Sequence, residues 1–220
     1  MRAASRCAWV DSAPVEQLPG LPEHAFRKAD QTPDADFYSF PRFVTHIDGA
    51  AIAAVTNAYR RHLPLGAAIL DVMSSWVSHL PDDVAYAQVV GHGMNAEELA
   101  ANPRLSRWFV QDLNQDPTLA LEADSFNGAC LCVSVQYLQR PVEVFRELAR
   151  VLCAGAPLVI AFSNRCFPTK AVAIWQSLSG PAQQQLVSAY LNAAGFRDII
   201  RETHAPAEGD PLWLVIGHAP

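Results

Sequence analysis

A short apolar run in the first half of the chain ends in an acid that two hydroxyl residues closely follow. Residues 67–70 run into Asp71, and Ser74 and Ser75 come shortly after it. A continuous apolar run of this length is typical of a strand buried on both faces in a parallel sheet. Open α/β sheets bind their ligands at the carboxyl ends of such strands. We therefore predict that this stretch is the first strand and the ligand-binding loop of a nucleotide-binding domain.

Strand-like and helix-like stretches alternate along the chain around this run. Apolar runs predict further strands at 87–91, 108–111, 128–133 and 158–162, and two last strands at 196–203 and 211–217. Capping residues and helical spacing predict helices at 49–62, from Asn95 onward, and at 141–152, 169–178 and 179–194. Only a turn-rich stretch separates the last two strands, so we expect them to pair antiparallel. The order predicts an α/β protein, a three-layer sandwich whose seven-stranded sheet is mostly parallel and ends in an antiparallel strand pair.

The composition is typical of a compact, enzyme-like domain. It argues against a nucleic-acid-binding protein and against a membrane protein. Half of the 220 residues are hydrophobic, 17% are charged, and the formal net charge is −6. Because this acidic balance lacks the basic footprint of a nucleic-acid binder, we expect no nucleic-acid partner. No apolar run approaches the roughly 18 residues of a membrane-spanning helix, so we expect no membrane partner.

The cysteines and histidines show no spacing that is typical of a metal site. The five cysteines include no CxxC pair, and the histidines form no HExxH pattern. We therefore expect no metal ligands in this chain. An odd number of cysteines without a disulfide framework predicts a reducing, cytoplasmic location.

The first part of the chain differs in composition from the remainder. Prolines interrupt residues 8–36, which predicts a loose lead segment that is partly ordered at best. A cluster of aromatic residues follows at 37–43 and needs a surface to pack against, and Asp48 is placed to cap the next helix. We divide the chain into a lead segment at 1–47 and a main domain at 48–220.

Five stretches of the sequence, taken in order, resemble the motifs of one enzyme family. They are 69–75, 89–99, 110–113, 126–138 and 150–158, the last similar to an RVLKPGGxL turn with Cys153 and Ala154 in place of Lys and Pro. Together they resemble the class I S-adenosylmethionine-dependent methyltransferases, and more narrowly a type-11-like branch that acts on small molecules. The resemblance covers about residues 37–217. It implies a Rossmann-like methyltransferase fold, S-adenosylmethionine as the cofactor, and a small-molecule methyl acceptor.

The resemblance also implies a cofactor site at the ends of the first four strands. Asp112 would accept a hydrogen bond from the adenine amino group, while Leu113 and Met94 would pack against the ring. The residues alone leave alternatives open, in which Asp112 caps a turn into Asn114 and Asp71 is a buried acid paired within its own loop. The implied cofactor-binding residues are Asp71, Met73, Ser74, Ser75, Gly91, Gly93, Met94, Asn95, Asp112, Leu113 and Ser134.

Two departures from the family pattern concern this cofactor site. Ser74 and Ser75 stand where the family has a glycine-rich loop, and their hydroxyls could bond the methionine part of the cofactor. A ribose-binding acid is expected about 20 residues after the first loop, where this chain has Gly93. Asn95 or a water would take over that role. We favour Asn95, since Gly91 and Gly93 would permit an unusual backbone path.

The substrate-facing candidates lie on segments that reach the same sheet edge, and the resemblance implies that one of these, the lead segment at 1–47, folds over the cofactor as a lid. They are Tyr38, Arg42, His46, Tyr137 and Arg165. Arg42 and His46 are one helical turn apart, so both would face one pocket if that stretch is helical. Arg165 would suit an anionic substrate group. The alternatives are that the aromatics belong to the core and that both arginines are solvated.

Three further residues near the first two strands have no assigned role. His92 directly follows the second predicted strand. It is either a loop histidine whose hydrogen bonds are made within the chain or a site residue. Trp76 and His79 either wall the cofactor or simply pack.

The sequence thus predicts a methyltransferase that moves a methyl group to a small molecule by in-line displacement. Such a displacement requires mainly alignment and exclusion of water, so no catalytic residue is assigned. One alternative is an inactive methyltransferase-fold protein that holds S-adenosylmethionine or S-adenosylhomocysteine. A nucleotide-dependent oxidoreductase lacks support, because no GxGxxG follows any predicted strand. The acceptor and the oligomeric state are not assigned.

Overall fold

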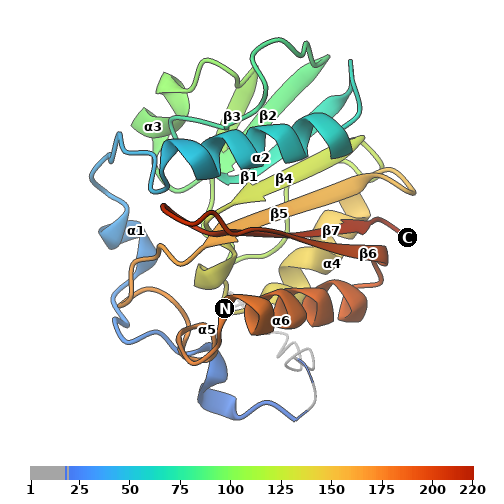
Figure 1. The fold of residues 1–220 in the computed structure, drawn as a ribbon. Helices are drawn as coiled ribbons and strands as arrows, with labels where there is room; N and C mark the ends of the chain where they lie inside the picture. The colour runs from blue at the N-terminus through green and yellow to red at the C-terminus, as the bar shows by residue number, and fades with distance from the viewer. Residues whose placement is uncertain (1–17, 19) are drawn as a thin grey trace, which may run out of the picture.

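The computed structural model describes Leu18 and residues 20–220, and it is built around one seven-stranded sheet (Figure 1). The strand order is β3-β2-β1-β4-β5-β7-β6. β1 to β5 run parallel, and β7 runs antiparallel to both β5 and β6. The predicted α/β class, strand number and antiparallel last pair are therefore confirmed. The strands are β1 (Ala68–Ser74), β2 (Gln88–Gly93), β3 (Arg107–Val110), β4 (Gly128–Cys132), β5 (Pro157–Ser163), β6 (Arg197–His204) and β7 (Leu212–His218).

Helices cover both faces of the sheet, which gives the three predicted layers. α2 (Gly49–His62) covers one face, and α4 (Pro141–Val151) and α6 (Gly180–Ala193) cover the other (Figure 1). Side chains along β1 alternate between the two layers, because successive residues of a strand point to opposite faces. Ile69 packs with Val55 of α2, while Leu70 belongs to the larger core under α4 and α6. The remaining elements are η1 (Glu23–Phe26), α1 (Asp34–Phe37), α3 (Ala96–Ala101), η2 (Val135–Tyr137) and α5 (Ala173–Gln176).

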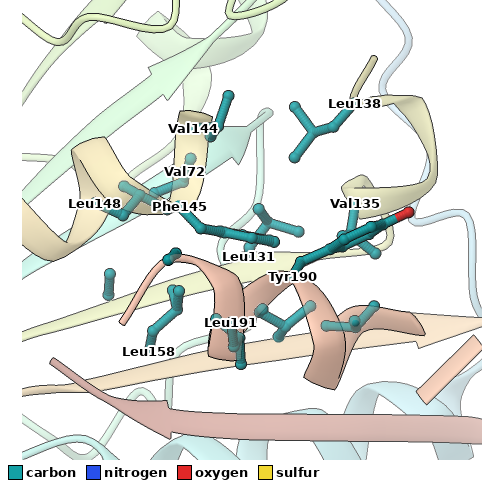
Figure 2. Packing of buried hydrophobic residues seen from close by; sticks show 14 of the residues in the cluster. Val72, Leu131, Val135, Leu138, Val144, Phe145, Leu148, Leu158, Tyr190 and Leu191 are labelled. Carbon is teal, nitrogen blue, oxygen red and sulfur yellow. The ribbon is translucent and has the colours of Figure 1, made fainter. Parts of the chain in front are cut away.

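The larger core forms where α4 and α6 meet the sheet (Figure 2). Pro141 opens α4, and the apolar residues of that helix, spaced for one face, are fully buried. Phe145 of α4 lies beside Tyr190 of α6, with ring centroids 6.2 Å apart. Figure 2 shows both rings against Leu131 of β4. This packing covers one face of the sheet with α4 and α6. It leaves the carboxyl ends of the strands available to form a site.

The predicted helix at 169–178 is wrong over its first part, since only Ala173–Gln176 is α-helical. The preceding backbone instead binds the lead segment. Val172 forms an antiparallel bridge with Lys28, and the N–H of Ala173 donates to the carbonyl of Arg27 at 2.9 Å. Tertiary hydrogen bonds thus replace the first helical turn.

The prediction of a loose lead segment is also wrong for the part that the structure describes. Residues 8–17 and 19 lie outside the described residues. From residue 20 onward the segment is held by buried charges. Lys28 pairs with Asp34, and the fully buried Lys170 lies 3.2 Å from Asp30 and 3.5 Å from Asp34. The ammonium of Lys170 also donates to the carbonyl of Thr32 at 2.7 Å, so these contacts tie the proline-rich stretch to the main domain.

Among the residues that the structure describes, no helix is long and apolar enough to cross a membrane. The same residues contain no group of three metal-ligating side chains.

Candidate active site

A cavity of about 310 Å³ lies where β1 to β5 end, and the lead segment closes one side of it. This volume is at the small end of the range of about 300–1,000 Å³ for ligand pockets. Fourteen of the predicted site residues line it: Asp71, Met73, Ser74, Ser75, Met94, Asn95, Asp112, Leu113 and Ser134 from the cofactor set, and Tyr38, Arg42, His46, Tyr137 and Arg165 from the substrate set. The sheet edge chosen from the sequence is therefore the edge that carries the cavity.

Asp71 lies in β1 and is only 3% exposed. The hydroxyl of Ser74 donates to its carboxylate at 2.6 Å, and the thiol of Cys130 approaches it at 3.6 Å. Burial raises the pKa of Asp71 to about 6, and the hydroxyl contacts oppose that rise. The interpretation of Asp71 as a buried acid paired within its loop is therefore confirmed, and the same residue lines the cavity.

Backbone strain is concentrated around the cavity. Among the described non-glycine residues, six have a positive φ, and four of these line the cavity. The four are His46 (64°), Met73 (53°), His79 (54°) and Val133 (44°). For a β-branched residue such as Val133 this backbone is a genuine outlier. Such strain persists only where the surroundings enforce it, and it clusters at functional sites.

Met73 adopts a backbone conformation that favours glycine, in a first loop that lacks the glycines of the family pattern. Its backbone is left-handed, a conformation that glycine adopts without cost. The imidazole of His92 holds it there. The N–H of Met73 donates to Nδ1 of His92 at 3.1 Å, and Nε2 of His92 donates to the carbonyl of Gln111 at 3.0 Å. His92 is 1% exposed, and this burial lowers its pKa to about 4, so the ring is neutral.

Gly91 and Gly93 do not line the cavity, and both lie in β2 with ordinary strand backbone. The predicted unusual backbone path at these glycines is therefore wrong. They serve close packing instead. A Cβ on Gly91 would meet the side chain of Leu105 at 2.3 Å, and one on Gly93 would meet the carbonyl oxygen of Ser74 at 2.5 Å.

Asn95 lines the cavity, but its side chain is already used within the chain. Its Oδ1 caps α3 by accepting from the N–H groups of Glu97 at 3.0 Å and Glu98 at 3.1 Å. Its Nδ2 donates to the carbonyls of Tyr38 at 2.9 Å and Ser39 at 3.3 Å. Both donors and the acceptor are thereby occupied, which argues against the ribose role that we predicted for this amide.

Glu98 was missed from the sequence, and among the carboxylates that line the cavity it is the nearest along the chain to Gly93, where the family pattern has its ribose-binding acid. It is 9% exposed, lines the cavity, and accepts from the N–H of Arg42 through Oε1 at 2.7 Å. Burial raises its pKa, and Arg42 opposes the rise. The only sequence signal was its place in the first turn of a helix that follows β2, which also fits a simple helix-dipole role.

Asp112 and Leu113 follow β3 and both line the cavity. The carboxylate of Asp112 also accepts from the N–H of Asn114 at 2.9 Å. The turn that we considered as the alternative role of Asp112 is therefore present. It fixes the carboxylate in place and leaves its second oxygen without a partner among the described residues.

The predicted substrate residues meet around an aromatic wall. The ring of Tyr137 stacks on that of Phe167 at 6.1 Å between centroids, and its hydroxyl accepts from the N–H of Phe167 at 2.9 Å. Burial raises the pKa of Tyr137 to about 12. Burial likewise raises the pKa of Tyr38 far above its usual value. Both phenols are therefore neutral hydrogen-bond donors near pH 7.

The two predicted cations are partly engaged by the chain itself. The stretch around Arg42 is not helical, contrary to the condition that we set, although Arg42 and His46 both line the cavity. The Arg42 guanidinium donates to the carbonyl of Phe37 at 2.8 Å and lies 4.5 Å from the centroid of that ring. Arg165 pairs with Asp210 at 2.7 Å, yet its side chain is 63% exposed. Arg165 is thus the freer of the two to meet an anionic group.

Other cavity residues were not predicted, because contacts between distant segments bring them there. Phe167 lies in the loop after β5, and Asp34 is supplied by the lead segment. His79 lines the cavity, whereas Trp76, for which we left the same two roles open, does not. Trp76 instead donates from Nε1 to the carbonyl of Val44 at 3.0 Å and so ties the lead segment to the loop after β1.

Neither a family model nor a curated protein matches the sequence. Solved structures share the fold. One, an S-adenosylmethionine-dependent methyltransferase from Aquifex aeolicus, is 16% identical with a TM-score of 0.56, covering 85% of this chain and 97% of that protein. Another, Haemonchus contortus phosphoethanolamine N-methyltransferase 2 in complex with S-adenosyl-L-methionine, is 13% identical with a TM-score of 0.57, covering 78% of this chain and 53% of that one.

A third solved structure with the same fold carries a different title. The cyclase SpnF is 16% identical with a TM-score of 0.57, covering 78% of this chain and 82% of that protein. The chain therefore has the Rossmann-like fold of S-adenosylmethionine-dependent methyltransferases. At these identities the likeness defines the fold, and the activity has to be argued from the cavity.

Proposed function

We propose that this protein is an S-adenosylmethionine-dependent methyltransferase that acts on a small molecule bound in the cavity. One observation carries the proposal. Three polar residues, Asp71 within β1, Asp112 just after β3 and Ser134 just after β4, all line one cavity at the carboxyl edge of the sheet. This edge is where open α/β sheets bind nucleotide-like ligands.

The residues present fit a cationic, nucleoside-containing methyl donor. The hydroxyl of Ser134 is buried and has no hydrogen-bond partner among the described residues, so it is available to a ligand. The buried carboxyl of Asp71 gains its charge only above pH 6, and a ligand ammonium beside it would favour the ionised form. When bound, the donor supplies an activated methyl group on a positively charged sulfur.

We assign the parts of this donor to the cavity residues as follows. Asp112 and Leu113 hold the adenine, and Ser74, Ser75 and Ser134 hold the methionine portion together with Asp71. Glu98 takes the ribose hydroxyls in place of Asn95, because its Oε2 has no partner among the described residues and Asn95 is fully engaged.

The lead segment acts as a lid in this proposal. Tyr38, Arg42 and His46 from this segment line the cavity. Asn95 and Glu98 of the α3 region hold the segment through hydrogen bonds to its backbone. A closed lid excludes water and aligns the acceptor with the methyl group, which are the two main requirements of an in-line displacement. The acceptor lies in this proposal against the aromatic wall of Tyr137 and Phe167.

The direct test is transfer of a labelled methyl group from S-adenosylmethionine to a broad panel of small acceptors. We expect transfer to at least one acceptor class, and we expect Asp112→Ala to reduce it by weakening the donor site. Asp116→Ala, an exposed acid a few residues further along the chain, is the matched control and should keep the activity. Absence of transfer to every acceptor, despite donor binding, would contradict the proposal.

The second candidate is a protein that binds S-adenosylmethionine or S-adenosylhomocysteine without turnover. One observation favours it: Gly93 stands where the family pattern has its ribose-binding acid, and the backbone there is tightly packed. The same labelled assay separates the two candidates, because the second one binds the donor and transfers nothing.

A further inference from the structure

Two histidines from different segments line the cavity in strained backbone conformations. His46 belongs to the lead segment and His79 to the loop after β1, and their φ angles are 64° and 54°. The hydroxyl of Thr56 in α2 holds the carbonyl of His79 at 2.9 Å. Left-handed backbone is uncommon for a residue other than glycine, and two such residues at one cavity point to a constraint beyond packing.

The rings of these two histidines are not used to hold the fold. Among the described residues, no side-chain or backbone group forms a hydrogen bond with a ring nitrogen of His46 or His79. His92 is the contrast, since both of its ring nitrogens bond the backbone. The structure thus separates one structural histidine from two whose nitrogens are available to a ligand.

The surroundings keep both rings neutral and therefore able to accept a proton. Burial lowers the pKa of His46, and the guanidinium of Arg42 lowers it further. Burial also lowers the pKa of His79, and His46 adds to this effect. A charge on one ring disfavours a charge on the other, which further favours the neutral forms. The other titratable groups that line the cavity are Asp34, Tyr38, Asp71, His92, Glu98, Asp112, Cys132, Tyr137, Arg165 and Cys166.

The aromatic wall beside the pair favours a planar ligand. The ring of His46 meets Phe167 edge-on at 5.4 Å, and Phe167 in turn stacks with Tyr137. Aromatic side chains prefer such offset and edge-on contacts with other flat rings. Of the two cavity arginines, Arg165 reaches solvent and Arg42 lies over the ring of Phe37.

From these contacts we propose that the His46–His79 pair is the proton acceptor for an aromatic hydroxyl substrate. This inference rests on the proposed function. The acceptor O–H bond breaks and its proton moves to an imidazole nitrogen, while the oxygen forms the new bond to the methyl carbon. The carbon–sulfur bond of the donor breaks, and its electron pair stays on sulfur, which becomes a neutral thioether. The imidazolium then returns its proton to solvent.

The test compares two acceptor types in the full-length protein. Catechol and simple phenols must lose a proton, whereas N,N-dimethylaniline has no proton to lose and needs no base. We expect the double variant His46→Asn/His79→Asn to lower transfer to phenols by about 100-fold or more, in line with general-base contributions, and to lower transfer to the aniline far less. Asparagine is chosen because it tolerates left-handed backbone. The matched control is His204→Asn on the exposed strand β6.

A second readout does not depend on turnover. In the complex with S-adenosylhomocysteine, the NMR ring signals of both histidines should shift when catechol is added, and their titration should change. Unchanged ring signals, equal losses for both acceptor types, or full phenol activity in the double variant would each overturn the inference. If wild-type protein binds no donor at all, the proposed function fails instead, and calorimetry shows that before any acceptor is added.

Discussion

The backbone N–H of Met73 donates a hydrogen bond of 3.1 Å to Nδ1 of His92. Nε2 of the same ring donates to the carbonyl of Gln111 at 3.0 Å. One imidazole therefore connects the end of β1 to the residue that follows β3, through its own place in β2. This connection holds the strained first loop in the shape that lines the cavity.

Removing the imidazole should destabilise the fold. His92→Ala leaves the N–H of Met73 and the carbonyl of Gln111 without their partner, and it opens a cavity in a buried region. We expect a loss of about 2–4 kcal/mol in the free energy of unfolding, measured by urea denaturation. His204→Ala on exposed β6 is the control and should change little. An unchanged unfolding midpoint for His92→Ala would show that the connection is not needed.

The pH dependence of stability should show two opposing contributions. His92 has its pKa lowered from 6.5 to about 4, so it contributes stability above pH 6.5 that is lost as the pH falls through 4. Asp71 has its pKa raised from 3.8 to about 6, so it contributes stability below pH 3.8 that is lost as the pH rises through 6. The two terms offset each other between about pH 4 and 6. Denaturation across this range should show a smaller loss of stability on acidification for the wild type than for Asp71→Asn.

At neutral pH, Asp71→Asn should separate stability from ligand binding. Keeping a buried carboxylate charged costs free energy, so the variant should gain on the order of 1–3 kcal/mol of unfolding free energy at pH 7. It should also bind the cationic donor more weakly, because the charge beside the ligand ammonium is gone. Denaturation and calorimetry at the same pH test both parts. A variant that is less stable and binds equally well would contradict this account of Asp71.

Ser134→Ala should affect binding and leave the fold intact. The hydroxyl of Ser134 is buried with no partner among the described residues, so its removal costs no intramolecular hydrogen bond. We expect unchanged or slightly higher stability, and a donor affinity reduced by about 1 kcal/mol, or roughly fivefold. Ser188→Ala removes a hydroxyl that bonds the carbonyl of Gln184 and should leave donor affinity unchanged. Full affinity in Ser134→Ala would mean that this hydroxyl does not meet the ligand.

Asn95→Asp should test how α3 holds the lead segment. Aspartate keeps the cap of α3, because a carboxylate accepts from the same N–H groups. It cannot donate to the carbonyls of Tyr38 and Ser39, which Asn95 now does. We therefore expect near-normal global stability with faster proteolysis within 34–47, compared with the wild type. Equal proteolysis rates would show that the segment is held by its other contacts alone.

The fold was predictable from the sequence because its signals are local. Buried strands such as β4 and β5 are short apolar runs between turns, and α4 carries its apolar residues on one face after Pro141. The helix expected at 169–178 failed because the backbone at Val172 pairs with Lys28, far away in sequence. Local spacing carries no information on such a pairing.

The site was predictable to the extent that strand ends determine it. Asp71, Asp112 and Ser134 follow from the order of the strands, since the carboxyl ends of parallel strands meet at one edge. The wrong backbone prediction at Gly91 and Gly93, and the occupied side chain of Asn95, have a different cause. Whether a glycine faces a ligand or a leucine, and whether an amide is free or bonded, depends on side chains brought in by other segments.

The central claim is that this cavity binds S-adenosylmethionine, and titration calorimetry with S-adenosylhomocysteine tests it most directly. We expect one binding site per chain in the wild type, weaker binding in Ser134→Ala and Asp71→Asn, and wild-type affinity in Ser188→Ala. No heat of binding at millimolar ligand, or wild-type affinity in both Ser134→Ala and Asp71→Asn, would contradict the account.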